Sequence, residues 1–208
     1  MARYLITHSL LSSWLYAIKD DPYEDATTER DKYAEFMTTL NRLPSEPTEA
    51  MQNGIDFENL VTQISDSPGL FERYAEKPRW YDAAKEIAGI VRGGQFQFKA
   101  RKAVSIDGME FVLFGKLDVL KAGSIYDIKF SKSYDRGKYY GSTQHPMYLE
   151  LVPEAQDFAY LVSNGTDVWT ETYTREETRS IFPVIADFAD WLRYQRLFPV
   201  YAEKWAAL

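Results

Sequence analysis

The sequence EFVLFGKLDVLKAGSIYDIKFS, residues 110–131, decides the fold that we expect for this chain. Residues 110–120 are rich in β-branched and aromatic side chains and predict one strand, and residues 125–131 predict a second. Residues 121–124 contain a glycine and predict the hairpin turn between the two strands. This part of the chain therefore forms an antiparallel pair within a larger sheet.

Two aspartates and one lysine of this hairpin form a candidate metal site. Residues two apart on a strand share a face, so Asp127 and Lys129 point the same way and Ile128 turns into the core. Asp118 comes level with Asp127 across the pair. Two carboxylates this close repel each other unless a cation lies between them, and hard oxygen ligands suit Mg²⁺ or Mn²⁺. On spacing alone, however, an exposed hairpin with a surface ion pair of little energy explains Asp-x-Lys better, because the pattern is common.

Further motifs resemble, in the same order, those of the PD-(D/E)XK nuclease superfamily, in its branch of RecB-type nuclease domains and phage exonucleases. That branch has Gly-x-x-x-(His/Glu) on an early helix, then the Asp strand, the Asp/Glu-x-Lys strand and a helix with Gln-x-x-x-Tyr. The matching residues are Gly54 with Glu58, Asp118, Asp127 with Lys129, and Gln144 with Tyr148. The resemblance covers residues 54–173, and residues 6–13 are similar to the serine-rich first helix of these domains.

The chain also departs from the family pattern. The family's Pro-Asp dipeptide is Leu117-Asp118 here, which removes no ligand. Some relatives bind an iron-sulfur cluster through four cysteines, and this chain has no cysteine, so such a cluster is excluded.

The resemblance implies a metal-dependent nuclease that hydrolyses DNA phosphodiester bonds, single- or double-stranded, as an exonuclease of phage or prophage recombination or repair. Glu58, Asp118, Asp127 and the Ile128 carbonyl would hold Mg²⁺ or Mn²⁺, and Lys129 would orient the attacking water or stabilise developing negative charge. Gln144 would contact that water or the nucleic-acid backbone, and Tyr148 the nucleic acid. A second copy of the chain or a recombination protein is a further candidate partner. Two alternatives stay open: an inactive nucleic-acid-binding or interaction module on the same scaffold, and a hydrolase of small phosphoesters.

The order of expected elements predicts an α/β fold with a mixed central sheet flanked by helices, which agrees with the restriction-endonuclease-like core that the resemblance implies. We expect one domain, with residues 1–94 mainly helical, 95–175 forming the sheet that carries the metal site, and 176–208 helical. Apolar spacing of three and four predicts helices, and alternation with turn dipeptides predicts strands. The expected helices are 10–18, 33–40, 51–64, 80–91 and 142–151, with a broken helical tail; the expected strands are 95–106, 110–120, 125–131, 157–162 and 168–174; and breaks are expected at Asp21-Pro22, 43–47 and 65–69.

The charge balance argues against a nucleic-acid enzyme, because 24 Lys and Arg face 31 Asp and Glu and give a net charge of −7. The local distribution of basic residues is therefore more informative about nucleic-acid binding than the net charge. Lys132, Arg136 and Lys138 alternate with tyrosines at 134, 139 and 140 and could contact phosphates and bases, although a solvated loop explains them equally well. A second basic stretch, Lys99, Arg101 and Lys102, is expected on one side of a strand and is more simply an exposed face. No apolar run approaches the ~20 residues of a membrane span, and no signal-peptide layout begins the chain, so we expect a cytoplasmic protein without membrane contact.

The remaining candidates are single residues near these motifs. His8 and His145 are the only histidines, which leaves little material for a zinc cluster or a Ser-His-Asp triad, and we expect both to be capping or surface residues. Gly54 is expected to let its helix approach the sheet closely. Glu58, one turn later on the same helical face, then points toward the core.

Overall fold

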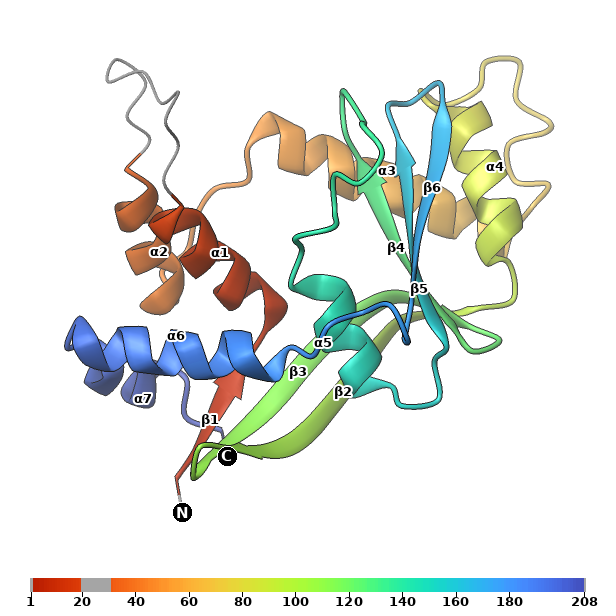
Figure 1. Cartoon of the computed structure of the whole chain (residues 1–208). Helices are drawn as coiled ribbons and strands as arrows, with labels where there is room; N and C mark the ends of the chain where they lie inside the picture. The colour runs from red at the N-terminus through yellow and green to blue at the C-terminus, as the bar shows by residue number, and fades with distance from the viewer. Residues whose placement is uncertain (1, 20–30, 208) are drawn as a thin grey trace.

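The computed structural model describes residues 2–19 and 31–207, and Figure 1 shows helices arranged around a twisted sheet. The strands are β1 (Arg3–Ile6), β2 (Gln95–Ile106), β3 (Met109–Lys121), β4 (Ser124–Phe130), β5 (Asp157–Ser163) and β6 (Val168–Thr174). The helices are α1 (His8–Ile18), α2 (Lys32–Leu40), α3 (Glu49–Asp66), α4 (Tyr81–Val91), α5 (Gln144–Leu151), α6 (Phe182–Tyr194) and α7 (Phe198–Lys204). The expected break at Asp21-Pro22 lies outside the described residues.

The sheet has the order β1-β3-β4-β5-β6, with β2 paired to the remaining edge of β3. The pairs β2–β3, β3–β4 and β5–β6 are antiparallel, whereas β1–β3 and β4–β5 are parallel. The antiparallel pair predicted over residues 110–131 is confirmed as β3 and β4, and so is the α/β class with a mixed sheet between helices.

The β1 strand is an addition that the sequence does not reveal. It pairs with the start of β3, from Arg3 opposite Glu110 to Ile6 opposite Leu113. β4 pairs with the far end of the same β3 edge, and its last paired residue is Tyr126, opposite Val119. Residues 114–118 of this edge therefore lie between two partner strands and are paired to neither of them.

The helices pack in two groups, one for each of two buried apolar clusters. Residues of α1, α2, α5, α6 and α7 form the first cluster with β3, β4 and β5, whereas α3 and α4 form the second with Val119, Ile128 and Leu161. Figure 1 shows α3 and α4 beside β4, β5 and β6, and α1, α2, α6 and α7 grouped beside β1. Helices from both groups reach the interrupted edge of β3.

Local sequence signals explain where these elements begin and turn. Asp107 and Gly108 have φ angles of +49° and +75°, the left-handed pair that a tight two-residue hairpin requires. Thr48 caps α3 by accepting a hydrogen bond from the Met51 amide. Pro183 and Pro199 lie in the first turns of α6 and α7, where a missing N–H costs no helical hydrogen bond.

The helices among residues 2–19 and 31–207 include none that is both long enough and apolar enough to span a membrane.

Candidate active site

Asp118 lies where the pairing of β3 with β4 ends. One step beyond the Val119–Tyr126 pair, its Oδ2 accepts a 2.9 Å hydrogen bond from the Ile128 amide. No strand carbonyl is available to this N–H at the interrupted edge, and the Asp118 carboxylate accepts its hydrogen bond instead. Because the N–H and C=O of one strand residue point to the same side, the Ile128 carbonyl also faces the interrupted edge of β3.

Asp127 and Lys129 share a face of β4, as predicted, and Ile128 is buried on the other. The Lys129 Nζ lies 2.7 Å from Asp127 Oδ2, and the Gln144 side-chain amide donates a hydrogen bond to Asp127 Oδ1. Asp127 is only 2% exposed. Apart from this ion pair with Lys129, the buried Oδ2 has no polar partner within the described chain.

Glu58 reaches the same place from α3, on the other side of the sheet edge. Its Oε1 accepts a hydrogen bond from the Gln97 side chain. Burial raises the pKa of Glu58, and the negative charge of Asp127 raises it further, whereas Lys116 and Lys129 lower it. Glu58 is half-buried, and electrostatic effects connect it with both Asp127 and Asp118, so it lies near the other two acids.

The negative charges of the acids act on Asp118 and on Lys129. Burial raises the pKa of Asp118 well above its usual value, and the charges of Asp127 and Glu58 add to this effect. For Lys129, burial lowers the pKa, but the charges of Asp127, Asp118 and Glu58 outweigh burial and the net pKa is raised. Lys129 is therefore an ammonium among three carboxylates, and the site carries an excess of negative charge.

The donor set matches the chemistry of a hard divalent cation. Asp118 Oδ1 and Glu58 Oε2 accept no hydrogen bond from the residues that the structure describes. With Asp127 Oδ2 and the Ile128 carbonyl, they are oxygen donors around one strand junction. Across residues 2–19 and 31–207, no three His, Cys, Asp or Glu side chains are already arranged as one ligand group. The acids are instead held by Ile128, Lys129, Gln97 and Gln144.

Helix α5 supplies Gln144 and is fixed by contacts with α1 and β3. The Thr143 hydroxyl donates to the His8 carbonyl at 3.1 Å and lies 2.8 Å from the Ser12 hydroxyl. The Tyr148 hydroxyl donates to the Lys116 carbonyl at 3.1 Å, and its ring is 3% exposed. Contrary to the expectation, Tyr148 thus lies in the core and holds β3, and its ring is not at a surface where nucleic acid could stack.

Three residues near the acids were not assigned to the site from the sequence: His8, Gln97 and Lys116. Burial, with the charge of Lys129, lowers the pKa of His8 to about 4 against a smaller opposing effect of Asp127, so its imidazole is neutral near pH 7. Gln97 lies between Phe96 and Phe98, which pair with Val119 and Leu117 of β3, and it has a φ of +54°. Nothing in the local sequence signals this conformation, because glutamine rarely adopts it.

His145 is also not the surface or capping residue that we expected. Its ring stacks on Tyr173 with centroids 4.1 Å apart, its Nδ1 lies 3.2 Å from the Tyr160 hydroxyl, and it is 4% exposed. Burial lowers the pKa of His145 to about 4. Its role is packing between α5 and the strands β5 and β6.

The basic loop after β4 is anchored by one carboxylate, Glu171. This side chain accepts hydrogen bonds from the Tyr134 and Tyr173 hydroxyls and from the amides of Gly137 and Tyr139. Of the loop tyrosines, 134 and 139 stack inward and only Tyr140, 67% exposed, faces solvent. The three loop cations are all exposed, with the Lys138 ammonium bonded to Ser131 and to the Ser133 carbonyl; they are Lys132, Arg136 and Lys138.

A cavity of about 610 Å³ opens beside Glu58 and Lys129. Gly54 and Ile55 of α3 and Phe130 of β4 also line it. A Cβ at Gly54 would meet no atom within 4 Å, so the expectation that Gly54 lets α3 approach the sheet closely is wrong. Gly54 instead borders the open space beside Glu58 and Lys129.

The second basic stretch divides between two faces of β2. The Lys102 ammonium lies 2.5 Å from Glu150 of α5, on the packed side of the strand. Lys99 and Arg101 are exposed on the opposite face. The expectation that all three share one side is therefore wrong for Lys102, because alternate strand residues point in opposite directions.

Comparison with solved structures finds a similar fold at low sequence identity. The crystal structure of SSO0001 matches 92% of this chain and 76% of its own chain, with a TM-score of 0.51 and 12% identity. No protein-family model matches the chain, and no curated protein is significantly similar to it. The likeness to SSO0001 shows the α/β fold alone.

Proposed function

We propose that this protein is a metal-dependent nuclease with a restriction-endonuclease-like core. The observation that carries the proposal is the convergence of Glu58, Asp118 and Asp127 from α3, β3 and β4, with the Lys129 ammonium beside them. Burial and the negative charge of Asp127 raise the pKa of Glu58 and of Asp118, and a group of carboxylates of this kind is costly to bury unless a cation compensates.

The residues that would hold Mg²⁺ or Mn²⁺ are Glu58, Asp118, Asp127 and, through its carbonyl, Ile128. When bound, such an ion lowers the pKa of a coordinated water and neutralises negative charge on a scissile phosphate. This chemistry supports hydrolysis of a phosphodiester bond.

The remaining side chains position the acids and add one positive charge. The Lys129 ammonium can orient the attacking water or stabilise negative charge that develops on the phosphate oxygens. The Gln144 amide fixes the orientation of Asp127, and the Gln97 amide fixes that of Glu58. These contacts limit the rotation of both carboxylates, which favours a preorganised site.

We propose DNA as the substrate and exonucleolytic cleavage as the mode, in a phage or prophage recombination or repair role. The cavity beside Gly54 supports access of a polymer to Glu58 and Lys129 from solvent. Lys132, Arg136 and Lys138 lie in the loop that follows the Lys129 strand, where they could contact phosphates on one side of the cleaved bond.

The test is cleavage of end-labelled linear and covalently closed circular DNA, single- and double-stranded, by purified protein with Mg²⁺ or Mn²⁺. We expect the ends of linear DNA to be degraded while circles survive. Lys129→Ala and Asp118→Ala should abolish cleavage and remain folded, whereas Lys85→Ala, which removes an exposed cation paired with Glu72, should cleave at the wild-type rate.

Wild-type rates in the Lys129→Ala or Asp118→Ala proteins would refute the site. Degradation of circular DNA at the rate of linear DNA would show that the protein is an endonuclease and not an exonuclease. Binding of DNA without turnover under any metal condition would favour the inactive binding module, and turnover of a chromogenic phosphodiester without cleavage of polynucleotides would favour a small-molecule hydrolase.

A further inference from the structure

The β2–β3 hairpin carries a row of exposed cations that begins beside the acids. Its members, which we call the cation row, are Lys116 of β3 and Lys99 and Arg101 of β2. Lys116 is two residues from Asp118, and its charge lowers the pKa of Glu58, so one end of the row acts directly on the acids. Lys99 lies opposite Lys116 in the register, and Arg101 follows two residues farther along β2.

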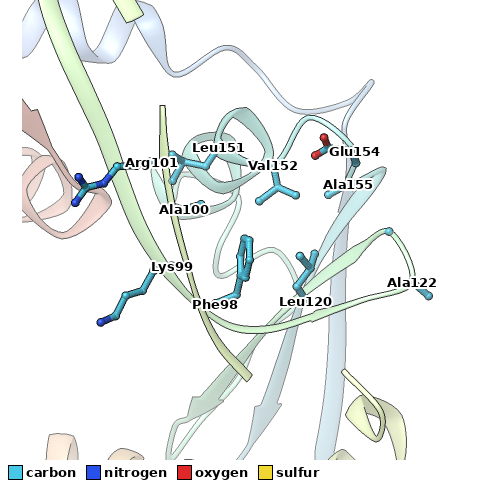
Figure 2. Close-up of a pocket in the computed structure, with 11 residues that line it drawn as sticks. Phe98, Lys99, Ala100, Arg101, Leu120, Ala122, Leu151, Val152, Glu154 and Ala155 are labelled. Carbon is cyan, nitrogen blue, oxygen red and sulfur yellow. The ribbon is translucent and has the colours of Figure 1, made fainter. Parts of the chain in front are cut away.

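Strand geometry places the row on one face. Alternate residues of a strand share a face, so Lys99 and Arg101 lie on one face of β2, and Lys116, directly opposite Lys99, lies on the same face of β3. Lys99 and Arg101 are among the residues that line a pocket beside β2, and Figure 2 shows that their side chains extend away from Phe98, Leu120 and Val152 of the same pocket. The cations therefore face solvent.

The hairpin itself gives no structural reason for this arrangement. Among the described residues, none of the three cations forms an ion pair. Lys99 and Lys116 are directly opposite each other, and like charges in that position destabilise a sheet. Asp118 lies two residues beyond Lys116, and Glu110 lies at the far end of the row's face, so the middle of this face is positive in a chain with a net charge of −7.

We propose that the cation row binds the sugar–phosphate backbone of a nucleic acid that passes over the acids. This proposal rests on the proposed nuclease function and extends it, because it assigns phosphate contacts to the hairpin side of the site, opposite the loop with Lys132, Arg136 and Lys138. A polyanion neutralises the repulsion between Lys99 and Lys116, and the exposed Arg101 side chain, near the Phe114 ring at 6.0 Å, is free to contact a phosphate. The row thus compensates locally for the acidic composition of the whole chain.

The experiment compares two double variants that remove the same charge. Lys99→Gln/Arg101→Gln removes the outer part of the row, and Lys85→Gln/Lys204→Gln removes two exposed cations elsewhere that are paired with Glu72 and Glu203. Both are made in the Lys129→Ala background, and binding of a labelled oligonucleotide is measured with Mn²⁺ over a range of salt. Thermal unfolding establishes that each variant is folded.

We expect the row variant to bind on the order of 10-fold more weakly at about 0.1 M salt and its slope of log affinity against log salt to fall by about 1.4, from about 0.7 for each lost contact with a single strand. The control should match the parent. A short block of uncharged methylphosphonate linkages can be placed at successive positions along the oligonucleotide. At one position it should weaken binding by the parent protein, and at that same position it should not change binding by the row variant. Equal affinities and slopes for the row and control variants, or no such position, would overturn the proposal.

The same experiment separates this inference from the proposed function. If wild-type protein cleaves DNA but the row variant binds like the control, the nuclease assignment stands and the cation row is wrong. If the row variant loses affinity but wild-type protein never cleaves, the row is supported and catalysis is refuted. Equal competition by polyglutamate and DNA would show a surface for acidic protein and would also overturn the proposal.

Discussion

Gln97 offers the sharpest test of how the acids are held. Its side-chain amide bonds Glu58, and its backbone has a φ of +54°, which for a non-glycine residue costs about 1–2 kcal/mol. A strained conformation at such a position is retained only where the surrounding structure requires it. Gln97→Ala removes the amide and keeps the strain, whereas Gln97→Gly removes both.

The two variants should therefore differ in stability and agree in metal dependence. Gln97→Gly relieves about 1–2 kcal/mol of strain and loses about 0.5–1 kcal/mol through the greater freedom of glycine in the unfolded chain. It should therefore be more stable than Gln97→Ala by up to about 1.5 kcal/mol. Removal of a partner that orients a metal ligand typically reduces metal affinity about 10- to 100-fold, so both variants should need that much more Mn²⁺.

Urea unfolding measures the first quantity, and calorimetric titration with Mn²⁺ measures the second without relying on activity. Asn53→Ala, on the far side of α3 beside a separate pocket, serves as the control for loss of an amide. Wild-type Mn²⁺ affinity in Gln97→Gly would refute the positioning of Glu58 by Gln97. A Gln97→Gly variant that is less stable than Gln97→Ala would refute the strain.

Three further predictions concern the packing around the site. Burial lowers the pKa of His145 to about 4, whereas an unfolded histidine titrates near 6.5, so the contribution of His145 to stability is complete above about pH 6.5 and is lost as pH falls toward 4. We expect the free energy of unfolding to decrease by about 2 kcal/mol between about pH 7 and 5. Urea titrations of His145→Asn should show a smaller dependence of this free energy on pH. Glu171→Gln leaves donors without an acceptor, so we expect a loss of about 1–3 kcal/mol and faster amide hydrogen exchange in residues 131–140; unchanged exchange would contradict the anchoring role. A Cβ on Gly115 would come within 2.6 Å of the Tyr148 ring, so Gly115→Ala should lower the free energy of unfolding, measured in urea or by heating, by about 1–3 kcal/mol. Its comparison is Gly54→Ala, which has open space around the new Cβ and should stabilise α3 by about 0.5–1 kcal/mol.

Much of the fold follows from local patterns in the sequence. Apolar spacing predicts the helices, and alternation with the turns at Asp107-Gly108 and residues 121–124 predicts the β2–β3–β4 meander. The face shared by Asp127 and Lys129 follows from the two-residue period of a strand. By contrast, β1 has four residues, too few to show alternation, and it is held by long-range pairing with β3.

The parts of the site that were missed depend on contacts between distant segments. Tyr148 is buried because Gly115 leaves room for its ring, and no local pattern links these two residues. His145 belongs to a helix that is buried on several sides, so α5 has no polar stripe from which its environment could be read. Gln97 contributes through a backbone conformation that glutamine seldom adopts, and Lys116 through its neighbour Lys99 on another strand.

The placement of the acids follows from the interrupted edge of β3. Where β1 has ended and β4 has not yet paired, backbone groups such as the Ile128 N–H and C=O lack a strand partner, and buried groups of this kind must be satisfied by other means. Asp118 satisfies the N–H, and a cation at the carbonyl would satisfy the remaining acceptor while neutralising the three carboxylates. The break in strand pairing would by itself destabilise the sheet. Here it leaves backbone groups that carboxylates can satisfy, and the negative charges of the site are therefore concentrated at this break. The cation row and the basic loop, on either side of that point, are then where a polyanion could be held against it.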